Sequence, residues 1–139
     1  GVGSRWEEVR TLAQTALDSE VVQEAVASGR YFRELFVSYP TTGLLLEGFV
    51  DLLFESPEGL TIVDYKTDNV DTDEEIDSAE ERYGLQMGAY AAALQRATGK
   101  TVVKAVLLFL RPKRAVIIND IDNLISLVDA RVSELVDTV

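Results

Sequence analysis

The segment that decides the fold spans residues 60–67 and reads LTIVDYKT. It follows a turn signal, Ser-Pro-Glu-Gly at 56–59, and it is rich in β-branched and aromatic residues, which is typical of a β-strand. Two charges interrupt the strand. Because successive side chains of a strand point to opposite faces, Asp64 and Lys66 share one face. A carboxylate and an ammonium group are therefore expected to project together from the end of this strand.

The segments before this strand supply two more predicted strands. Residues 44–54 form a mostly apolar stretch that carries the carboxylate of Asp51, and residues 31–38 alternate between apolar and polar positions. Short connections between three consecutive strands favour an antiparallel meander. If the second strand pairs with the third across the turn at Pro57, Asp51 comes to lie beside Asp64.

Outside these three predicted strands, apolar residues recur with helical spacing at both ends of the chain and once in its middle. The expected helices cover residues 5–18, 19–28, a stretch through Tyr83 to about Thr98, and 120–135; two further strands cover 102–110 and 115–118. The predicted order is α-α-β-β-β-α-β-β-α. This order predicts an α/β fold in which helices flank a mixed β-sheet.

The amino-acid composition excludes several classes of protein and of functional site. The 139 residues fit a single domain, 1–139, with 13 basic and 24 acidic residues and therefore a formal net charge of −11. The chain has no Cys and no His, which excludes disulfides, thiolate zinc sites, cysteine nucleophiles and Ser-His triads built from this chain. The longest apolar run, 105–110, is too short to span a membrane. A cytoplasmic protein without a membrane partner is expected.

Acidity bears on the partners as well. Bulk attraction to nucleic acid requires Lys and Arg, so an acidic chain is not expected to hold nucleic acid by charge alone. Eight acidic residues and no basic one lie between Asp68 and Glu81. This segment is interpreted as a solvated loop or as the negatively charged start of a helix. A calcium loop beginning at Asp71 is disfavoured because its sixth position is Ile76, where a glycine is required.

The two carboxylates and the lysine have a chemical explanation. Neighbouring carboxylates repel each other unless a hard cation such as Mg2+ lies between them. Such a cation polarises a phosphoryl oxygen, and an adjacent lysine stabilises the charge that develops. Asp51, Asp64 and Lys66 are therefore candidates for metal-assisted phosphodiester hydrolysis. In the alternative, Asp64 and Lys66 form a strand-end ion pair and Asp51 caps a turn.

Three motifs together resemble a known family. The segments GFVD (48–51), IVDYKT (62–67) and QMGAY (86–90) resemble, in order and spacing, the nuclease domain of the RecB family within the PD-(D/E)xK superfamily. The likeness extends upstream through residues 29–34 and covers about residues 19–110. The resemblance implies a restriction-endonuclease-like fold. It also implies that the chain is related to the nuclease domains of bacterial UvrD/RecB/AddA-type helicase-nucleases.

The resemblance also implies roles for individual residues. Asp51 and Asp64 would ligate Mg2+, with Mn2+ as a substitute, and the backbone carbonyl of Tyr65 would be a further ligand. Lys66 would be the catalytic lysine.

On the following helix, Gln86 and Tyr90 would contact DNA, and Arg82, one turn earlier, would contact a phosphate. Core packing is the alternative for Tyr90, which belongs to an apolar stripe. Glu34 is a candidate supporting residue because strand parity places it on the face of two phenylalanines. It would support the metal or bridge to Lys66, or else pair with a neighbouring arginine, Arg33 or Arg30.

Family members usually supply another metal ligand, a His or Glu, from a helix well upstream. The first predicted helix offers Glu7 and Glu8 but resembles a later helix of the family. The chain is therefore expected to be a fragment of a larger helicase-nuclease that lacks the ligand-bearing helix, and such a fragment is expected to lose activity in isolation.

The predicted function is a Mg2+-dependent DNA nuclease, an exonuclease, attached to an ATP-dependent helicase in recombination and repair. Its partners would be DNA, the motor domains and a second helicase-nuclease subunit. One alternative is a catalytically silent module that guides DNA or serves in subunit docking, and another is a stand-alone exonuclease.

Overall fold

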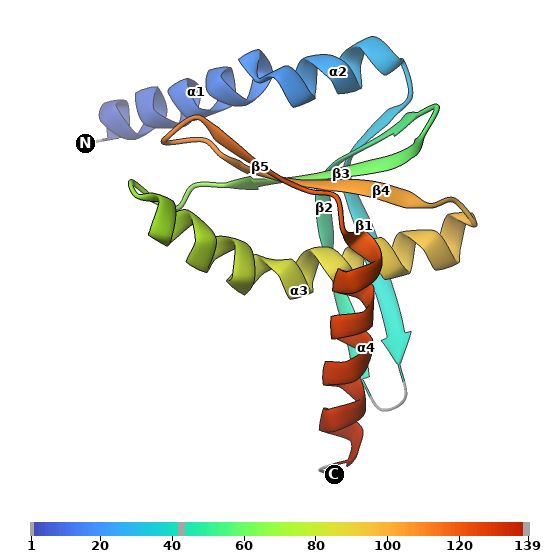
Figure 1. Ribbon diagram of the computed structural model, residues 1–139. Coiled ribbons are helices and arrows are strands. Elements are labelled where there is room, and N and C mark those ends of the chain that lie inside the picture. The colour runs from blue at the N-terminus through green and yellow to red at the C-terminus, as the bar shows by residue number, and fades with distance from the viewer. Residues whose placement is uncertain (1, 42–43, 138–139) are drawn as a thin grey trace.

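The computed structural model describes the backbone of residues 2–41 and 44–137, and the side chains of residues 5–39 and 47–131. Over these residues the elements follow the predicted order (Figure 1). They are α1 (Val2–Asp18), α2 (Glu20–Ser28), β1 (Tyr31–Thr41), β2 (Leu44–Ser56), β3 (Gly59–Lys66), α3 (Asp73–Thr98), β4 (Val102–Phe109), β5 (Arg114–Ile118) and α4 (Ile121–Asp137). None of the described helices has the length and apolar character needed to cross a membrane.

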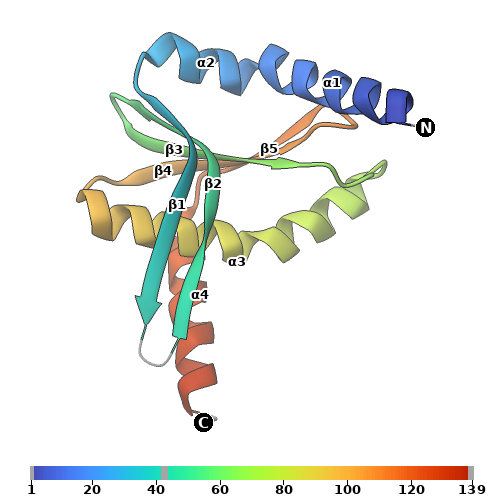
Figure 2. The ribbon, with the colours of Figure 1, turned by 180° about the vertical axis from the view of Figure 1, so that it is seen from behind.

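The strands form one mixed sheet in the spatial order β1-β2-β3-β4-β5. The first three strands pair antiparallel, which confirms the predicted meander, and β4 pairs antiparallel with β5. The central pair, β3 and β4, is parallel and is connected through α3. Two views from opposite sides show that the long β1–β2 hairpin crosses the direction of the other strands (Figure 2).

Helices cover both faces of this sheet, with α1 and α2 on one side and α3 and α4 on the other (Figure 1). Each face has its own apolar cluster. On the α3 side, Val50 and Ile62 pack with Met87, and on the α1–α2 side Leu52 and Val63 pack with residues of the two N-terminal helices. The strand β3 is therefore buried on both faces, and a charge on it must find a partner inside the protein.

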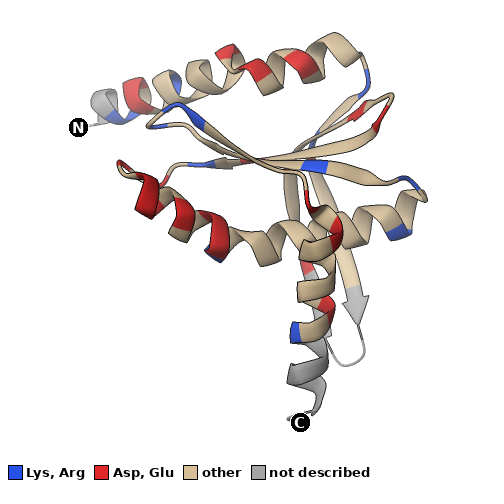
Figure 3. Ribbon diagram, viewed as in Figure 1, with Lys and Arg blue, Asp and Glu red and all other residues tan. Residues whose placement is uncertain are grey.

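Local signals in the sequence explain where the helices begin and end. Ser19 caps α2 at its N-terminus and Gly29, with a φ of 68°, ends it. Thr72 caps α3, and the first turn of α3 carries three acidic residues, which favour the positive end of the helix dipole. Figure 3 shows this acidic first part of α3. From Asp73 onward the acidic segment is therefore a helix start, as one of the two interpretations predicted, while residues 68–72 precede the helix.

The alternation of side chains reverses at one level of the β1–β2 hairpin. Val50 and Leu52 are two residues apart on β2, yet they belong to the apolar clusters on opposite faces of the sheet. The residue between them is Asp51. Opposite Asp51 in the ladder register lies Glu34, whose φ is 53°, in the left-handed region. The reversal places Asp51 at the bend where the outer half of the hairpin leaves the sheet.

Candidate functional site

The site begins where the ladder between β2 and β3 ends. The last described pair of that ladder is Leu52 with Val63, so Asp51 and Asp64 are the next residues on the two strands. Instead of another backbone pair, the Asp51 side chain accepts a hydrogen bond at Oδ2 from the backbone N–H of Tyr65, at 2.7 Å. This bond fixes the carboxylate of Asp51 beside the end of β3.

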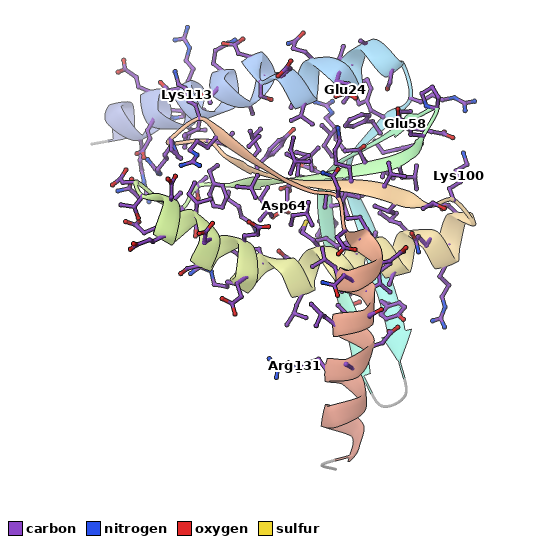
Figure 4. The ribbon with its side chains drawn as sticks, viewed as in Figure 1. Glu24, Glu58, Asp64, Lys100, Lys113 and Arg131 are labelled. Carbon is purple, nitrogen blue, oxygen red and sulfur yellow. The ribbon has the colours of Figure 1, made fainter. Side chains whose placement is uncertain are left out.

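Asp64 and Lys66 lie on the same face of β3, as strand parity predicted, and their side chains pair. That face packs against α3, and Asp64 lies between β3 and this helix (Figure 4). Lys66 Nζ lies 2.5 Å from Asp64 Oδ2, and the two side chains are only 12% and 9% exposed. The two groups form an ion pair, but the angles between them do not meet the geometry of a hydrogen bond. As a result, Asp64 Oδ2 is a buried oxygen without a hydrogen-bond partner among the described residues.

Three side chains of α3 complete the surroundings of Lys66. Gln86 Oε1 accepts a hydrogen bond from Lys66 Nζ at 3.2 Å, and Gln86 Nε2 donates to the hydroxyl of Tyr90 at 3.1 Å. The ring of Tyr83 lies beneath the ammonium group, with its centroid 3.6 Å from Lys66 Nζ. The lysine is therefore held by an acid, an amide and an aromatic face.

The electrostatics of the site show an excess of negative charge at Asp51. Its pKa is raised from 3.8 to about 6, chiefly because burial disfavours the charged form and also because the carboxyl of Asp64 is adjacent. The Tyr65 N–H and the charge of Lys66 act in the opposite direction. Burial also raises the pKa of Tyr90, and the charge of Asp64 adds to that effect. Without a cation, one proton would help to relieve the repulsion between the two acids.

This arrangement fits a hard divalent cation. The site offers two adjacent carboxylates, one of them with a buried oxygen that lacks a hydrogen bond. No group of three or more His, Cys, Asp or Glu side chains suited to a metal is found within the described part of the chain. From this part, Asp51 and Asp64 are thus the acidic ligands available, and the ligation by the Tyr65 carbonyl stays a prediction.

The predicted DNA-contacting residues already have partners within the protein. Tyr90 is 8% exposed and belongs to the core, as the packing alternative for this residue predicted. Arg82 is 60% exposed and forms a 2.7 Å ion pair with Asp68. Gln86 lies at the site but bonds to Lys66. Contacts of Gln86, Tyr90 and Arg82 with DNA stay predictions.

The expected placement of Glu34 is wrong. The side chain of Glu34 is exposed because the alternation of β1 reverses at Glu34 itself, and those of Phe32 and Phe36 are exposed as well. Within the described residues Glu34 bonds neither to Lys66 nor to a neighbouring arginine, and it does not join the two aspartates in a metal-binding group.

Two residues of the site escaped the sequence analysis. Tyr83 was part of the apolar stripe of a helix, although it lies one turn before Gln86, a spacing that places both on one helix face. Gly48 opens the GFVD motif, and a Cβ at this position would overlap the Tyr90 hydroxyl and lie 3.1 Å from its ring carbon Cζ. The glycine therefore provides the space into which Tyr90 reaches.

The geometry can be compared with known proteins. An ATP-dependent helicase/nuclease subunit of Clostridium botulinum (strain 657 / Type Ba4) is 46% identical over 72 residues, covering 51% of this chain and 5% of that protein. The protein of the same name from Thermoanaerobacter sp. (strain X514) is 32% identical over 98 residues, covering 66% of this chain and 8% of that protein. The chain thus matches only a small part of these relatives.

A solved structure shares the fold. A protein of Eubacterium rectale, named only as a candidate exonuclease, superposes with a TM-score of 0.58 over 91% of this chain and 50% of that chain, at 13% identity. The sequence model of the PD-(D/E)XK nuclease superfamily matches residues 4–137. The chain, with its mixed sheet, its restriction-endonuclease-like fold and its paired acids beside a lysine, therefore belongs to the PD-(D/E)XK nuclease superfamily.

Proposed function

We propose that this domain is a Mg2+-dependent deoxyribonuclease, an exonuclease, that hydrolyses phosphodiester bonds as part of an ATP-dependent helicase-nuclease. One observation carries the proposal: Asp64 Oδ2 is buried, lacks a hydrogen bond among the described residues, and lies beside Asp51 and Lys66. The ammonium group of Lys66 pairs with this oxygen, but it is one positive charge beside two adjacent carboxylates, so the two acids keep an excess of negative charge. A hard cation is the ligand that suits such a pair of acids.

The protein side of the reaction follows from the contacts. Asp51 and Asp64 would hold Mg2+, or Mn2+ in its place, and when bound the cation would polarise the phosphate and lower the pKa of a water. Asp51 is kept in place by the Tyr65 N–H. Lys66 is directed by Gln86 and would donate a hydrogen bond to a phosphate oxygen as negative charge develops on it.

DNA delivery is assigned to other parts of the protein. With a net charge of −11, this domain is poorly suited to capture DNA by charge. The relatives are named as subunits of ATP-dependent helicase/nucleases, and we propose that motor domains of the same parent chain, together with a partner subunit, bring the strand to the site. Gln86 and Arg82 would then meet the backbone at the entrance, with Tyr90 contributing its hydroxyl.

The direct test uses the full-length gene product with the substitution Asp64→Asn, which keeps the volume of the side chain and removes its charge. We expect DNA cleavage to be lost while ATP hydrolysis is retained and the domain stays folded. Asp122→Ala, which removes an exposed carboxylate from the first turn of α4, is the matched control and should cut normally. Normal cleavage by Asp64→Asn would refute the proposal.

Calorimetric titration with Mg2+ and Mn2+ separates this function from a catalytically silent module. The nuclease is expected to bind the cation, and the Asp51→Ala variant is expected to lose that binding. A protein that neither binds the metal nor cuts DNA would instead be a module for DNA guiding or subunit docking.

A further inference from the structure

Tyr83 contacts Lys66 through its aromatic face. The ring centroid is 3.6 Å from Lys66 Nζ, a distance at which the negative face of the ring attracts the ammonium group. Tyr83 lies on α3 three residues before Gln86, which bonds to the same nitrogen. The two residues therefore approach Lys66 from one helix, on the side away from β3.

The orientation of this ring is fixed at its other end. The Tyr83 hydroxyl donates to the carboxylate of Asp68, with contacts of 2.9 Å to Oδ2 and 3.2 Å to Oδ1. Asp68 also forms the ion pair with Arg82, whose guanidinium carbon lies 4.7 Å from the Tyr83 ring centroid. Asp68 follows β3 by two residues, so it links the end of that strand to the first half of α3.

We infer that Tyr83 is a positioning residue of the nuclease site: its ring holds the ammonium group of Lys66 at the reacting phosphate, and Asp68 sets the angle of that ring. This inference rests on the proposed function, because it assigns Tyr83 a part in the same reaction. Tyr83 itself does not touch the substrate in this scheme.

The aromatic face suits this task better than a third acid or amide would. A carboxylate beneath Lys66 would accept one of its three N–H groups and compete with the phosphate for the lysine. A ring face attracts the cation less directionally, so the lysine stays in place while its N–H groups remain able to turn toward the phosphate. The nearly buried side chain of Lys66, 12% exposed, strengthens this attraction because little water screens it.

The test measures kcat and KM for DNA cleavage by the full-length gene product carrying substitutions at Tyr83. Tyr83→Leu removes the ring, and we expect kcat to fall about tenfold with little change in KM, the scale of one partly buried cation–π contact. Tyr83→Phe and Asp68→Ala both keep the ring but remove the hydroxyl–carboxylate contact that fixes its orientation, so both should give a kcat between those of the wild type and Tyr83→Leu.

The chain offers a matched control in Tyr39. Its ring also lies under a cation, Arg96, at 5.3 Å, and its hydroxyl donates to an aspartate, Asp129, at 3.2 Å. It lies on the outer half of β1, away from Lys66. Tyr39→Leu should therefore destabilise the fold to a similar extent as Tyr83→Leu but leave kcat unchanged.

A second measurement does not depend on cleavage. A proton over a ring face is shifted upfield, so the ε-protons of Lys66 should show such a shift in the wild type and in Tyr83→Phe, and lose it in Tyr83→Leu. If the wild type cuts DNA and Tyr83→Leu cuts with the same kcat, or if the upfield shift is absent from the wild type, the positioning role is wrong and the nuclease stands. If the wild type does not cut DNA with either Mg2+ or Mn2+, the proposed function is wrong, and the positioning role of Tyr83 is wrong as well.

Discussion

The carboxylate of Asp51 accepts the backbone N–H of Tyr65 at 2.7 Å, so a side chain takes the place of the next rung in the ladder between β2 and β3. This single bond allows the two strands to separate without leaving a buried N–H unpaired. It also brings the first acid beside the second, Asp64, whose own charge raises the pKa of Asp51. The same contact therefore ends the ladder and builds the acid pair.

The first prediction concerns pH. The pKa of Asp51 is raised from 3.8 to about 6, so the folded protein holds an extra proton between these values. The stability that this proton contributes is complete below pH 3.8 and is lost as the pH rises through about 6. The shift corresponds to an upper limit of about 3 kcal/mol, which solvent screening of this half-buried carboxylate reduces.

The substitution Asp51→Asn should remove this dependence. An asparagine keeps an oxygen for the Tyr65 N–H and gains an amide that can donate to Asp64. Urea unfolding in EDTA should therefore show a metal-free variant that is more stable than the wild type at pH 7 and equal to it near pH 4. If the free energy of unfolding of Asp51→Asn depends on pH as steeply as that of the wild type, the pH dependence does not come from Asp51.

The second prediction concerns Gly48. In Gly48→Ala the new methyl group overlaps the hydroxyl of Tyr90 and lies 3.2 Å from its ring carbon Cε1. We expect a loss of about 1 to 3 kcal/mol in the free energy of unfolding. Nuclease activity should also fall, because Tyr90 is the hydrogen-bond partner of Gln86.

A double-mutant cycle checks the cause of this loss. Tyr90→Phe deletes the nearest overlapping atom, so the double variant Gly48→Ala/Tyr90→Phe should be more stable than the sum of the two single losses predicts. Purely additive losses would mean that the methyl group disturbs something other than Tyr90.

The third prediction separates metal binding from chemistry at Lys66. Lys66→Met keeps the length of the side chain and removes its charge, so cleavage should fall by roughly 100-fold or more. Binding of Mg2+ should persist, because the lysine competes with a cation for Asp64 rather than supporting it. Lys104→Met, at a half-buried lysine of β4, is the control and should cut normally. Parallel loss of metal affinity and cleavage would show that Lys66 acts on the metal site alone.

The fourth prediction concerns Glu34. Its φ of 53° is a conformation that glycine adopts freely, so Glu34→Gly should raise the free energy of unfolding by about 1 kcal/mol. Glu34→Ala loses the same carboxylate but keeps the Cβ, and should bring no such gain. Both variants should cut DNA at the wild-type rate, measured on the full-length gene product. A common loss of cleavage would restore a supporting role to the carboxylate.

Much of the fold could be predicted because its signals are local. The order of elements follows from hydrophobic periodicity, and the two ends of α2 follow from Ser19 and Gly29. The common face of Asp64 and Lys66 follows from strand parity, since β3 is regular over those residues.

The sequence by itself determined which chemical groups are available and which strand carries them. Tertiary structure alone decided the environment of Lys66 and the fate of Glu34. Which residues of α3 face the lysine depends on how that helix docks on the sheet, a relation that periodicity within the helix does not specify. The exposure of Glu34 depends on a reversal of alternation shared with Asp51 across the hairpin, and parity counted along one strand fails where the backbone turns left-handed.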